Sequence, residues 1–482
     1  MEWTNLFIHN PSEPLLFHTG IFLFLFSLFL IAYSFIYQNQ KVRNISLILF
    51  GFYFYYKASG LFLILLIISL SADYIFSKWI HNCKKTKLRK LIFIFGILFS
   101  LSFLVYFKYS NFFLENISYL THNNYILSDL ILPIGISFYT FQSISYLVDI
   151  YQNKIQPSGF MNYMLYMTFF PHLVAGPIVR AKDFLPQITS ATKLNKDNIN
   201  EAFYLIIKGF IKKAIIADFI AQYADSVFST PDGFSGTEHL ISSLCYTLQI
   251  FCDFSGYTDM AIGIALLLGF RLCINFDSPY KSINITNFWH RWHISLSSWL
   301  RDYVYIPFGG NKKGFSLQML FLLLTMLIGG FWHGASWKFV FWGAGHGMLL
   351  ILHKLILLKF PKKSDKPIFN FVSWLFTFIC VSLLWIPFRA TSMEETIFIY
   401  NKIFTDIEFK YFSAIYFSNT LLIYFLLIGY TITLLPNTIK EFVKKQFYHA
   451  SIITKFVILA ILIQLFLQVK SSSIQPFIYF HF

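Results

Sequence analysis

A polar segment with residue types suited to acid–base chemistry lies between apolar stretches at residues 286–311. Its sequence, TNFWHRWHISLSSWLRDYVYIPFGGN, combines three Trp, two His, two Arg and one Asp. His290 and His293 are three residues apart, so on a helix they would share a face. Charges at membrane depth usually pair and mark functional cavities, which makes Arg291 and Asp302 candidate site residues. An interfacial amphipathic helix with Trp at headgroup depth is the alternative.

A second segment, 329–347 (GGFWHGASWKFVFWGAGHG), places His333 between glycines inside an apolar run. The glycines would let backbones approach closely, and Trp332 would help to exclude water. Burial keeps an imidazole neutral, and a neutral imidazole can accept a proton from a hydroxyl as a general base. A histidine that only hydrogen-bonds across helices is the alternative. His346 is a weaker candidate of the same kind.

Two acids, Asp253 and Asp259, flank a Ser and a Tyr in the segment DFSGYTD. We expect them to orient a histidine or to pair with an arginine, and Asp149 is another candidate buried acid. A Ser-His-Asp hydrolase is disfavoured because the sequence has no GxSxG elbow. Walker A, GxGxxG, HExxH and EF-hand patterns are also missing. The five cysteines form no CxxC and are interpreted as packing residues.

Membrane helices must position these residues. Of 482 residues, 56% are hydrophobic and 13% are charged, about half the charged fraction of an average soluble domain. The net charge is +15, but the Lys and Arg residues occur in short clusters between apolar runs, as in cytoplasmic loops. Nucleic-acid binding, disorder and a secreted disulfide scaffold are therefore excluded.

Hydropathy predicts an all-α polytopic protein with ten to thirteen crossings, because about 20 apolar residues span a bilayer. Segments near 160–180 and 286–308 are predicted to be re-entrant or broken helices. The predicted spans are 15–37, 45–57, 61–80, 91–107, 131–151, 202–221, 239–269, 317–332, 336–358, 368–389, 418–436 and 452–469.

The Lys and Arg clusters predict the orientation in the membrane. Loops 81–90 and 359–366 would be cytoplasmic, so the N-terminus would lie outside and residues 470–482 on the outer face. One membrane domain is expected over the whole chain. Its parts are N-terminal helices (1–130), a motif-bearing core (131–360), and C-terminal helices with an outward tail (361–482).

Several of these segments, in this order, resemble the membrane-bound O-acyltransferase (MBOAT) superfamily. The similar branch is the bacterial one of alginate and peptidoglycan O-acetyltransferase membrane subunits and teichoic-acid D-alanyl transferases. Because His290 is often Arg there, His290 is not counted as essential. The resemblance covers most of the chain from about residue 130 onward. It rests on LPIGISFYTFQSISYLVDIY (132–151), FFPHLVAGPIVR (169–180), DFSGYTDMAIGIALLLGF (253–270), NFWHRWHISLSSWLRDYVYIPFGGN (287–311), GGFWHGASWKFVFWGAGHG (329–347) and PFIYFHF (476–482).

The resemblance implies a ring of transmembrane and re-entrant helices around a thin centre with a tunnel. It places the family's shared histidine at His333 and the second histidine at His293. His333 would take a proton from an attacking hydroxyl. Donors to the resulting oxyanion would come from His293, Arg291 or indole N–H groups such as those of Trp289 and Trp332.

The resemblance also implies the substrates. The donor would be acetyl-CoA or a carrier-bound acyl thioester, with no tightly bound cofactor or metal, and the acceptor would be an envelope polysaccharide. Tyr479 in the tail would carry the acyl group to a periplasmic SGNH-type transferase, because a phenol is easier to activate than a sugar hydroxyl. An interfacial anchor is the alternative for the tail.

Two other functions are alternatives to acyl transfer. A transporter or flippase commonly shows repeated halves, and no internal repeat is visible. A haem or metal protein would use His293 and His333 as ligands, and purified haem protein would absorb visible light.

Overall fold

The computed structural model describes residues 8–10, 14–127, 129–190, 195–360 and 366–469, and their regular structure is entirely helical. The predicted all-α class is therefore confirmed. The chain divides into two compact units. Unit 1 comprises residues 1–206 and 258–273, and unit 2 comprises residues 207–257 and 274–482.

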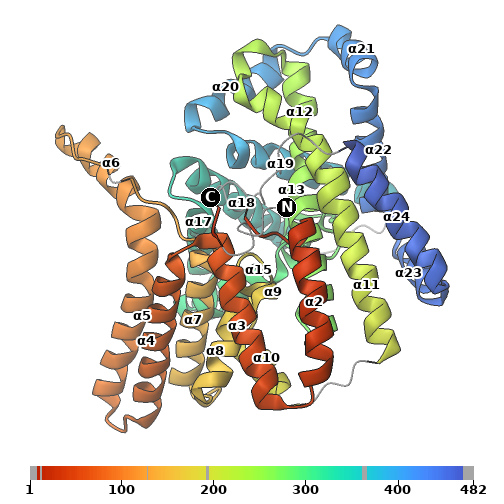
Figure 1. Ribbon diagram of the computed structural model, residues 1–482. Coiled ribbons are helices and arrows are strands. Elements are labelled where there is room, and N and C mark those ends of the chain that lie inside the picture. Colours follow the sequence, from red (N-terminus) through yellow and green to blue (C-terminus); the bar gives the residue numbers. More distant parts are fainter. Residues whose placement is uncertain (1–7, 11–13, 128, 191–194, 361–365, 470–482) are drawn as a thin grey trace. The chain divides into compact units, whose positions relative to one another are not determined.

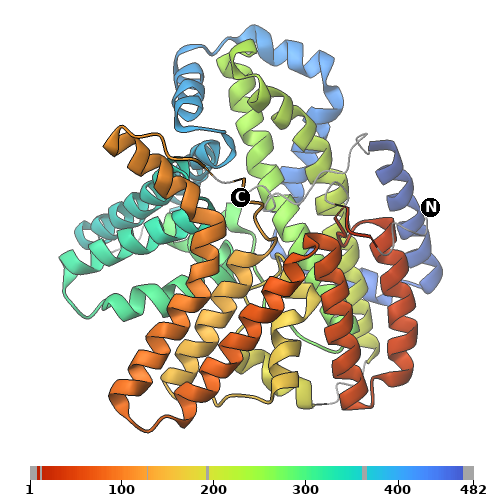
Figure 2. The same cartoon turned by 60° about the vertical axis from the view of Figure 1, so that its left-hand side comes forward.

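Unit 1 is built on a row of apolar helices. In both views α4, α5 and α7 lie side by side, and α3 packs on α8 (Figures 1 and 2). Asp73 is fully buried on α4 and accepts a hydrogen bond from the Ser100 hydroxyl of α5 at 2.6 Å. The elements wholly in this unit are α2 (Gly20–Ile36), α3 (Gln40–Ser59), α4 (Phe62–Asn82), α5 (Thr86–Leu104), η1 (Val105–Tyr109), α6 (Ser110–Thr121), α7 (Ile136–Tyr151), α8 (Phe160–Thr168), α9 (Phe170–Leu173) and α10 (Ala181–Thr189).

Residues 258–273 complete the core of unit 1. The ring of Phe270 lies 4.9 Å from that of Phe169 and stacks on Phe184 at 5.1 Å, measured between ring centroids. The Tyr33 hydroxyl donates a hydrogen bond to the Leu268 carbonyl at 2.8 Å. Two helices, α11 (Lys196–Phe210) and α13 (Gly236–Leu267), contribute turns to both units.

Unit 2 contains the two histidine-bearing segments, 287–311 and 329–347. Its remaining elements are η2 (Ile211–Ala217), α12 (Asp218–Ser229), η3 (Pro231–Gly233), η4 (Pro279–Lys281), α14 (Ile285–Arg291), α15 (Ile294–Leu300), η5 (Arg301–Tyr305), α16 (Ile306–Phe308), α17 (Phe315–His333), α18 (Trp337–Lys359), α19 (Pro367–Arg389), α20 (Met393–Thr405), α21 (Phe409–Ser418), α22 (Thr420–Leu434), α23 (Asn437–His449) and α24 (Ile452–Val469).

Helices α17 and α18 form a tight hairpin, drawn in teal (Figure 2). A Cβ on Gly330 would lie 2.2 Å from the Phe339 carbonyl oxygen, and one on Gly343 would lie 2.4 Å from that of Met326. Any side chain at these two positions would therefore push the backbones apart. The predicted close approach at the glycine-rich segment is confirmed.

Six described helices are long and apolar enough to cross a membrane, and two bent helix pairs raise this number to eight. The predicted ten to thirteen crossings also counted shorter apolar helices, such as α2 with 17 residues. The segments predicted to be broken are short helices here: α8 and α9 in one, and α14 to α16 in the other.

Candidate functional site

His333 is the last residue of α17 and is 3% exposed. The following Gly334 is extended, and a Cβ there would lie 2.1 Å from the Phe339 ring. The helix therefore ends at the imidazole and turns directly into α18. The ring of His333 makes edge contacts at 5.0 Å with both Trp342 and Phe388, so aromatic surface surrounds the predicted base.

His293 lies at the junction between α14 and α15 and is completely buried. Its backbone is left-handed, with φ +41°, and its Nδ1 accepts a hydrogen bond from the Leu296 N–H at 3.3 Å. The imidazole thus serves as the N-cap of α15. Burial lowers the pKa of His293 to about 3, so the ring is neutral at physiological pH.

The prediction that His290 and His293 share one helix face is wrong. The helix α14 ends at Arg291, and the chain is extended at Trp292. Ile294 then donates its N–H to the Asn275 carbonyl at 2.9 Å, a tertiary hydrogen bond that fixes the turn. His290 is exposed, whereas His293 points into the unit.

Trp332 brings the two predicted histidines into one site. Its ring centroid lies 6.3 Å from that of His293 and 4.9 Å from that of His333. Phe254 of α13 covers His293 with an edge contact at 4.7 Å. Two buried imidazoles therefore flank one indole in unit 2.

The third predicted histidine, His346, lies one step further along α18. It is completely buried, and its ring lies 4.7 Å from Trp342 and 5.1 Å from Trp289. Because Trp342 also contacts His333, the aromatic cluster runs without interruption from His293 to His346. Trp289 and Trp332 thus lie in the same aromatic cluster as the three histidines.

Asp253 pairs with a lysine, Lys213, at 2.6 Å, rather than with the arginine or histidine expected. Lys213 also pairs with Asp218 at 2.8 Å. Lys213 and Asp253 are almost fully buried, so the three charges form a compact interior network. The lysine lies on the π-helical turn η2, and the adjacent pair of lysines inside an apolar run was the sequence signal for it.

Each of the other three predicted acids is described by its own surroundings. Asp302 pairs with its neighbour Arg301 at 2.8 Å, where the arginine side chain is 63% exposed. Asp259 belongs to unit 1, and on an ideal helix its side chain is rotated by about 120° from that of Asp253. Asp149, also in unit 1, lies 3.8 Å from Lys154.

Sequence reasoning missed a basic cluster that gathers residues from α11, η2, η4, α14 and α23. Lys440 lies within electrostatic range of Lys208, Lys212 and Lys281, and Lys281 within that of Arg291. All five cations are half-buried. Asp277 contacts Arg291 at 3.7 Å and offsets part of their charge. This basic cluster is defined by Lys208, Lys212, Lys281, Arg291 and Lys440.

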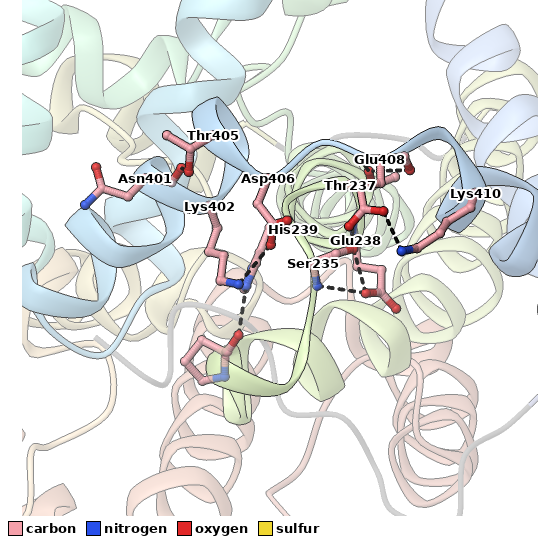
Figure 3. Close-up of polar contacts among 11 residues, drawn as sticks. Ser235, Thr237, Glu238, His239, Asn401, Lys402, Thr405, Asp406, Glu408 and Lys410 are labelled. Carbon is pink, nitrogen blue, oxygen red and sulfur yellow. Dashed lines mark hydrogen bonds and ion pairs between the residues drawn. The ribbon is translucent and has the colours of Figure 1, made fainter.

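A separate polar cluster joins the start of α13 to the connection between α20 and α21 (Figure 3). Glu238 accepts hydrogen bonds from the N–H and the hydroxyl of Ser235 at 2.9 and 2.8 Å, as in a capping box. Lys402 pairs with Asp406 at 2.9 Å, and a ring nitrogen of His239 lies 3.0 Å from a carbonyl of η3. These groups cap helix ends, so their role is structural.

Tyr479, the predicted acyl carrier, lies outside the described residues.

Within the part of the chain that the structure describes, no three His, Cys, Asp or Glu side chains are grouped so that they could hold a metal ion.

The fold and the site define a polytopic helical membrane protein with buried histidines in an aromatic interior. The chain belongs to the membrane-bound O-acyltransferase family, MBOAT, whose family model matches residues 48–387.

Three relatives illustrate the range of this similarity. The probable alginate O-acetylase AlgI of Pseudomonas putida is 41% identical over 67% of this chain. The peptidoglycan O-acetyltransferase of Helicobacter pylori is 39% identical over 70% of the chain and 69% of its own length. The teichoic acid D-alanyltransferase of Bacillus subtilis is 31% identical over 46% of the chain and 59% of its own length. The chain spans 66% of the alginate O-acetylase, just under two thirds.

Replacing Lys213 by Met should destabilise the protein strongly, because it leaves Asp253 and Asp218 without their shared cation. Breaking a buried ion pair in this way costs about 3–5 kcal/mol. Thermal unfolding of detergent-solubilised protein measures the loss. Lys410→Met is the matched control, since its exposed pair with Glu408 contributes about 0–1 kcal/mol. Equal unfolding temperatures for the two variants would contradict a structural role for the buried network.

Proposed function

We propose that this protein transfers an acetyl group from a thioester donor to a hydroxyl for the O-acetylation of an envelope or extracellular polysaccharide. The observation that carries the proposal is the pair of buried histidines, His293 and His333, on either side of Trp332 in a chain of the O-acyltransferase family. The relatives named for alginate and peptidoglycan acetylation support an acetylated glycan.

His333 is the proposed general base. Its burial at the end of α17 favours the neutral imidazole that proton abstraction requires. It takes the proton of the attacking hydroxyl, and the same proton then neutralises the departing thiolate. His293 contacts the ring of Trp332 at 6.3 Å between centroids. Its Nδ1 already caps α15, so a role of this imidazole in transfer would use its Nε2.

Replacing His333 by Ala should reduce acetyl transfer by about 10²–10⁴-fold, the usual contribution of a general base. Ester-linked acetate released from isolated envelope polysaccharide measures the effect, and immunoblotting of membranes confirms expression. His290→Arg is the matched control, because His290 is exposed and outside the aromatic cluster. Wild-type acetate content in a well-expressed His333→Ala strain would remove His333 from the mechanism.

We propose acetyl-CoA as the donor, and the basic cluster supports an anionic donor of this kind. Lys212 donates a hydrogen bond to Ser255 at 3.1 Å, next to Phe254, which covers His293. The cations therefore lie beside the histidine site rather than on a remote surface. Five half-buried cations with one acid nearby fit the three phosphate groups of coenzyme A, which accept charge-assisted hydrogen bonds.

The double variant Lys281→Gln, Lys440→Gln should raise the KM for acetyl-CoA by about 10-fold or more, because each lost charged hydrogen bond contributes about 1.5–3 kcal/mol. Steady-state transfer by the purified protein measures KM and kcat separately. Lys402→Gln, in the structural cluster of Figure 3, is the control. An unchanged KM for acetyl-CoA would point to a different donor, such as a carrier-bound thioester.

The proposed setting is the bacterial inner membrane. Loops 81–90 and 359–366 are basic, which favours their retention in the cytoplasm and places both termini outside. Lys440, on α23, belongs to another basic segment. The same rule would put the basic cluster on the cytoplasmic side, where a coenzyme A thioester is available.

The tail is the proposed link to the acceptor. With residues 470–482 outside, the Tyr479 hydroxyl would receive the acetyl group with His333 as base, and a periplasmic SGNH-type transferase would pass it to the polysaccharide. A phenol with a pKa near 10 is easier to deprotonate than a sugar hydroxyl, and its ester releases the acetyl group more readily.

Replacing Tyr479 by Phe should abolish envelope acetylation, because it removes one oxygen and keeps the ring. Mass spectrometry of the wild-type C-terminal peptide should also detect an acetyl ester that the variant lacks. His481→Gln, a polar exchange in the same tail, should retain acetylation. If Tyr479→Phe acetylates normally, the tail is an anchor and the acyl carrier is elsewhere.

A further inference from the structure

Three buried polar groups around His346 have no hydrogen-bond partner among the described residues. They are the indole N–H groups of Trp289 and Trp342 and both ring nitrogens of His346. Trp342 and His346 are 1% and 0% exposed, and Trp289 is 8% exposed. An unsatisfied buried group of this kind costs about 1–3 kcal/mol. Three of them side by side therefore require an explanation beyond packing.

The three rings form one compact group. The centroid of Trp289 lies 5.1 Å from that of His346 and 5.7 Å from that of Trp342, and Trp342 lies 4.7 Å from His346. All three contacts are edge-on. Phe288 stacks parallel to His346 at 6.0 Å and covers its other face. The polar atoms thus occur in an otherwise aromatic enclosure.

The chemistry of these groups specifies what they can bind. An indole nitrogen only donates, and a neutral imidazole donates with one nitrogen and accepts with the other. The enclosure therefore offers mainly N–H donors and carries no formal charge. A carbonyl oxygen, which becomes negative only during reaction, fits such a group better than a permanent anion.

The enclosure adjoins the proposed base. The ring of Trp342 contacts His346 on one side at 4.7 Å and His333 on the other at 5.0 Å. If the carbonyl oxygen of a thioester accepts a hydrogen bond from the Trp342 N–H, the carbonyl carbon lies close to the His333 ring. This contact connects the unsatisfied donors to the reacting atoms.

We propose that Trp289 and Trp342 bind the carbonyl oxygen of the acyl group and stabilise the oxyanion, with His346 positioning the two indoles. This inference rests on the proposed function. The acceptor hydroxyl oxygen attacks the carbonyl carbon while its proton passes to His333, so a C–O bond forms and the carbonyl π electrons move onto oxygen. The indole N–H groups donate to that oxyanion. When the carbonyl is restored, the C–S bond breaks and the thiolate takes the proton from His333.

Trp→Phe exchanges test the assignment because they delete an N–H and keep an aromatic ring. Trp342→Phe and Trp289→Phe should each lower kcat by about 100-fold, as removal of an oxyanion donor does, with the KM for acetyl-CoA changed less than about 3-fold. His346→Gln, which keeps an N–H, should retain more activity than His346→Leu.

Trp374→Phe is the matched control in the same unit. The Trp374 N–H donates to the Tyr280 carbonyl at 2.7 Å, so its loss removes a satisfied structural bond rather than an available donor. This variant should keep kcat within about 3-fold of wild type. If all three Trp→Phe variants lose activity in proportion to their unfolding temperatures, the donors are structural and the assignment fails.

A spectroscopic readout separates binding from catalysis. The probe is a ketone analogue of acetyl-CoA in which a methylene replaces sulfur, labelled with ¹³C at the carbonyl. Its infrared C=O band should move to lower frequency on binding wild-type protein, and this shift should shrink in Trp342→Phe. An unshifted band, or the same shift in both proteins, would overturn the assignment while leaving acetyl transfer intact. Wild-type protein that neither transfers acetyl from acetyl-CoA nor binds the ketone would overturn the proposed function and this inference together.

Discussion

The close approach of α17 and α18 is the constraint on which the candidate site depends. Gly330 and Gly343 have no room for a side chain because each faces a carbonyl oxygen of the other helix. This contact sets where α17 ends and therefore where His333 lies. It also sets the register that brings Trp342 of α18 against His333 of α17. A shift of one residue on either helix would separate the imidazole from the indole donors.

Burial has opposite consequences for the two kinds of polar group in unit 2. Lys213 lies between two carboxylates, so its charge is matched and the network stabilises the fold. Trp289, Trp342 and His346 are equally enclosed but are not matched by protein groups that the structure describes. A ligand would add little stability to the Lys213 network, because its charges are already paired. At Trp289, Trp342 and His346, a ligand oxygen would accept hydrogen bonds that the protein does not make, and would thereby offset the free-energy cost of burying these groups.

Sequence reasoning succeeded where local pattern determines structure. The glycine-rich segment around His333 predicted a close helix approach, and the apolar runs predicted an all-α membrane fold.

Sequence reasoning failed where tertiary contacts determine the structure. The helix expected to carry His290 and His293 is broken, because Ile294 bonds to Asn275 and His293 caps the next helix. The lysine partner of Asp253 could not be read from spacing, since η2 and α13 are separated in the chain. The basic cluster likewise gathers residues from distant segments, and Tyr479 lies outside the described residues.

Unit 1 is discontinuous in the chain, and this has a consequence for biosynthesis. Its core includes Phe270, which packs on Phe169 and Phe184, yet residues 207–257 of unit 2 are made first. During translation the first helices must therefore remain in the translocation machinery or the bilayer with an incomplete core until α13 has been synthesised. The same problem would arise if the protein were expressed as two fragments divided after residue 206. The N-terminal fragment would lack Phe270, which the second fragment would have to supply to the core of unit 1.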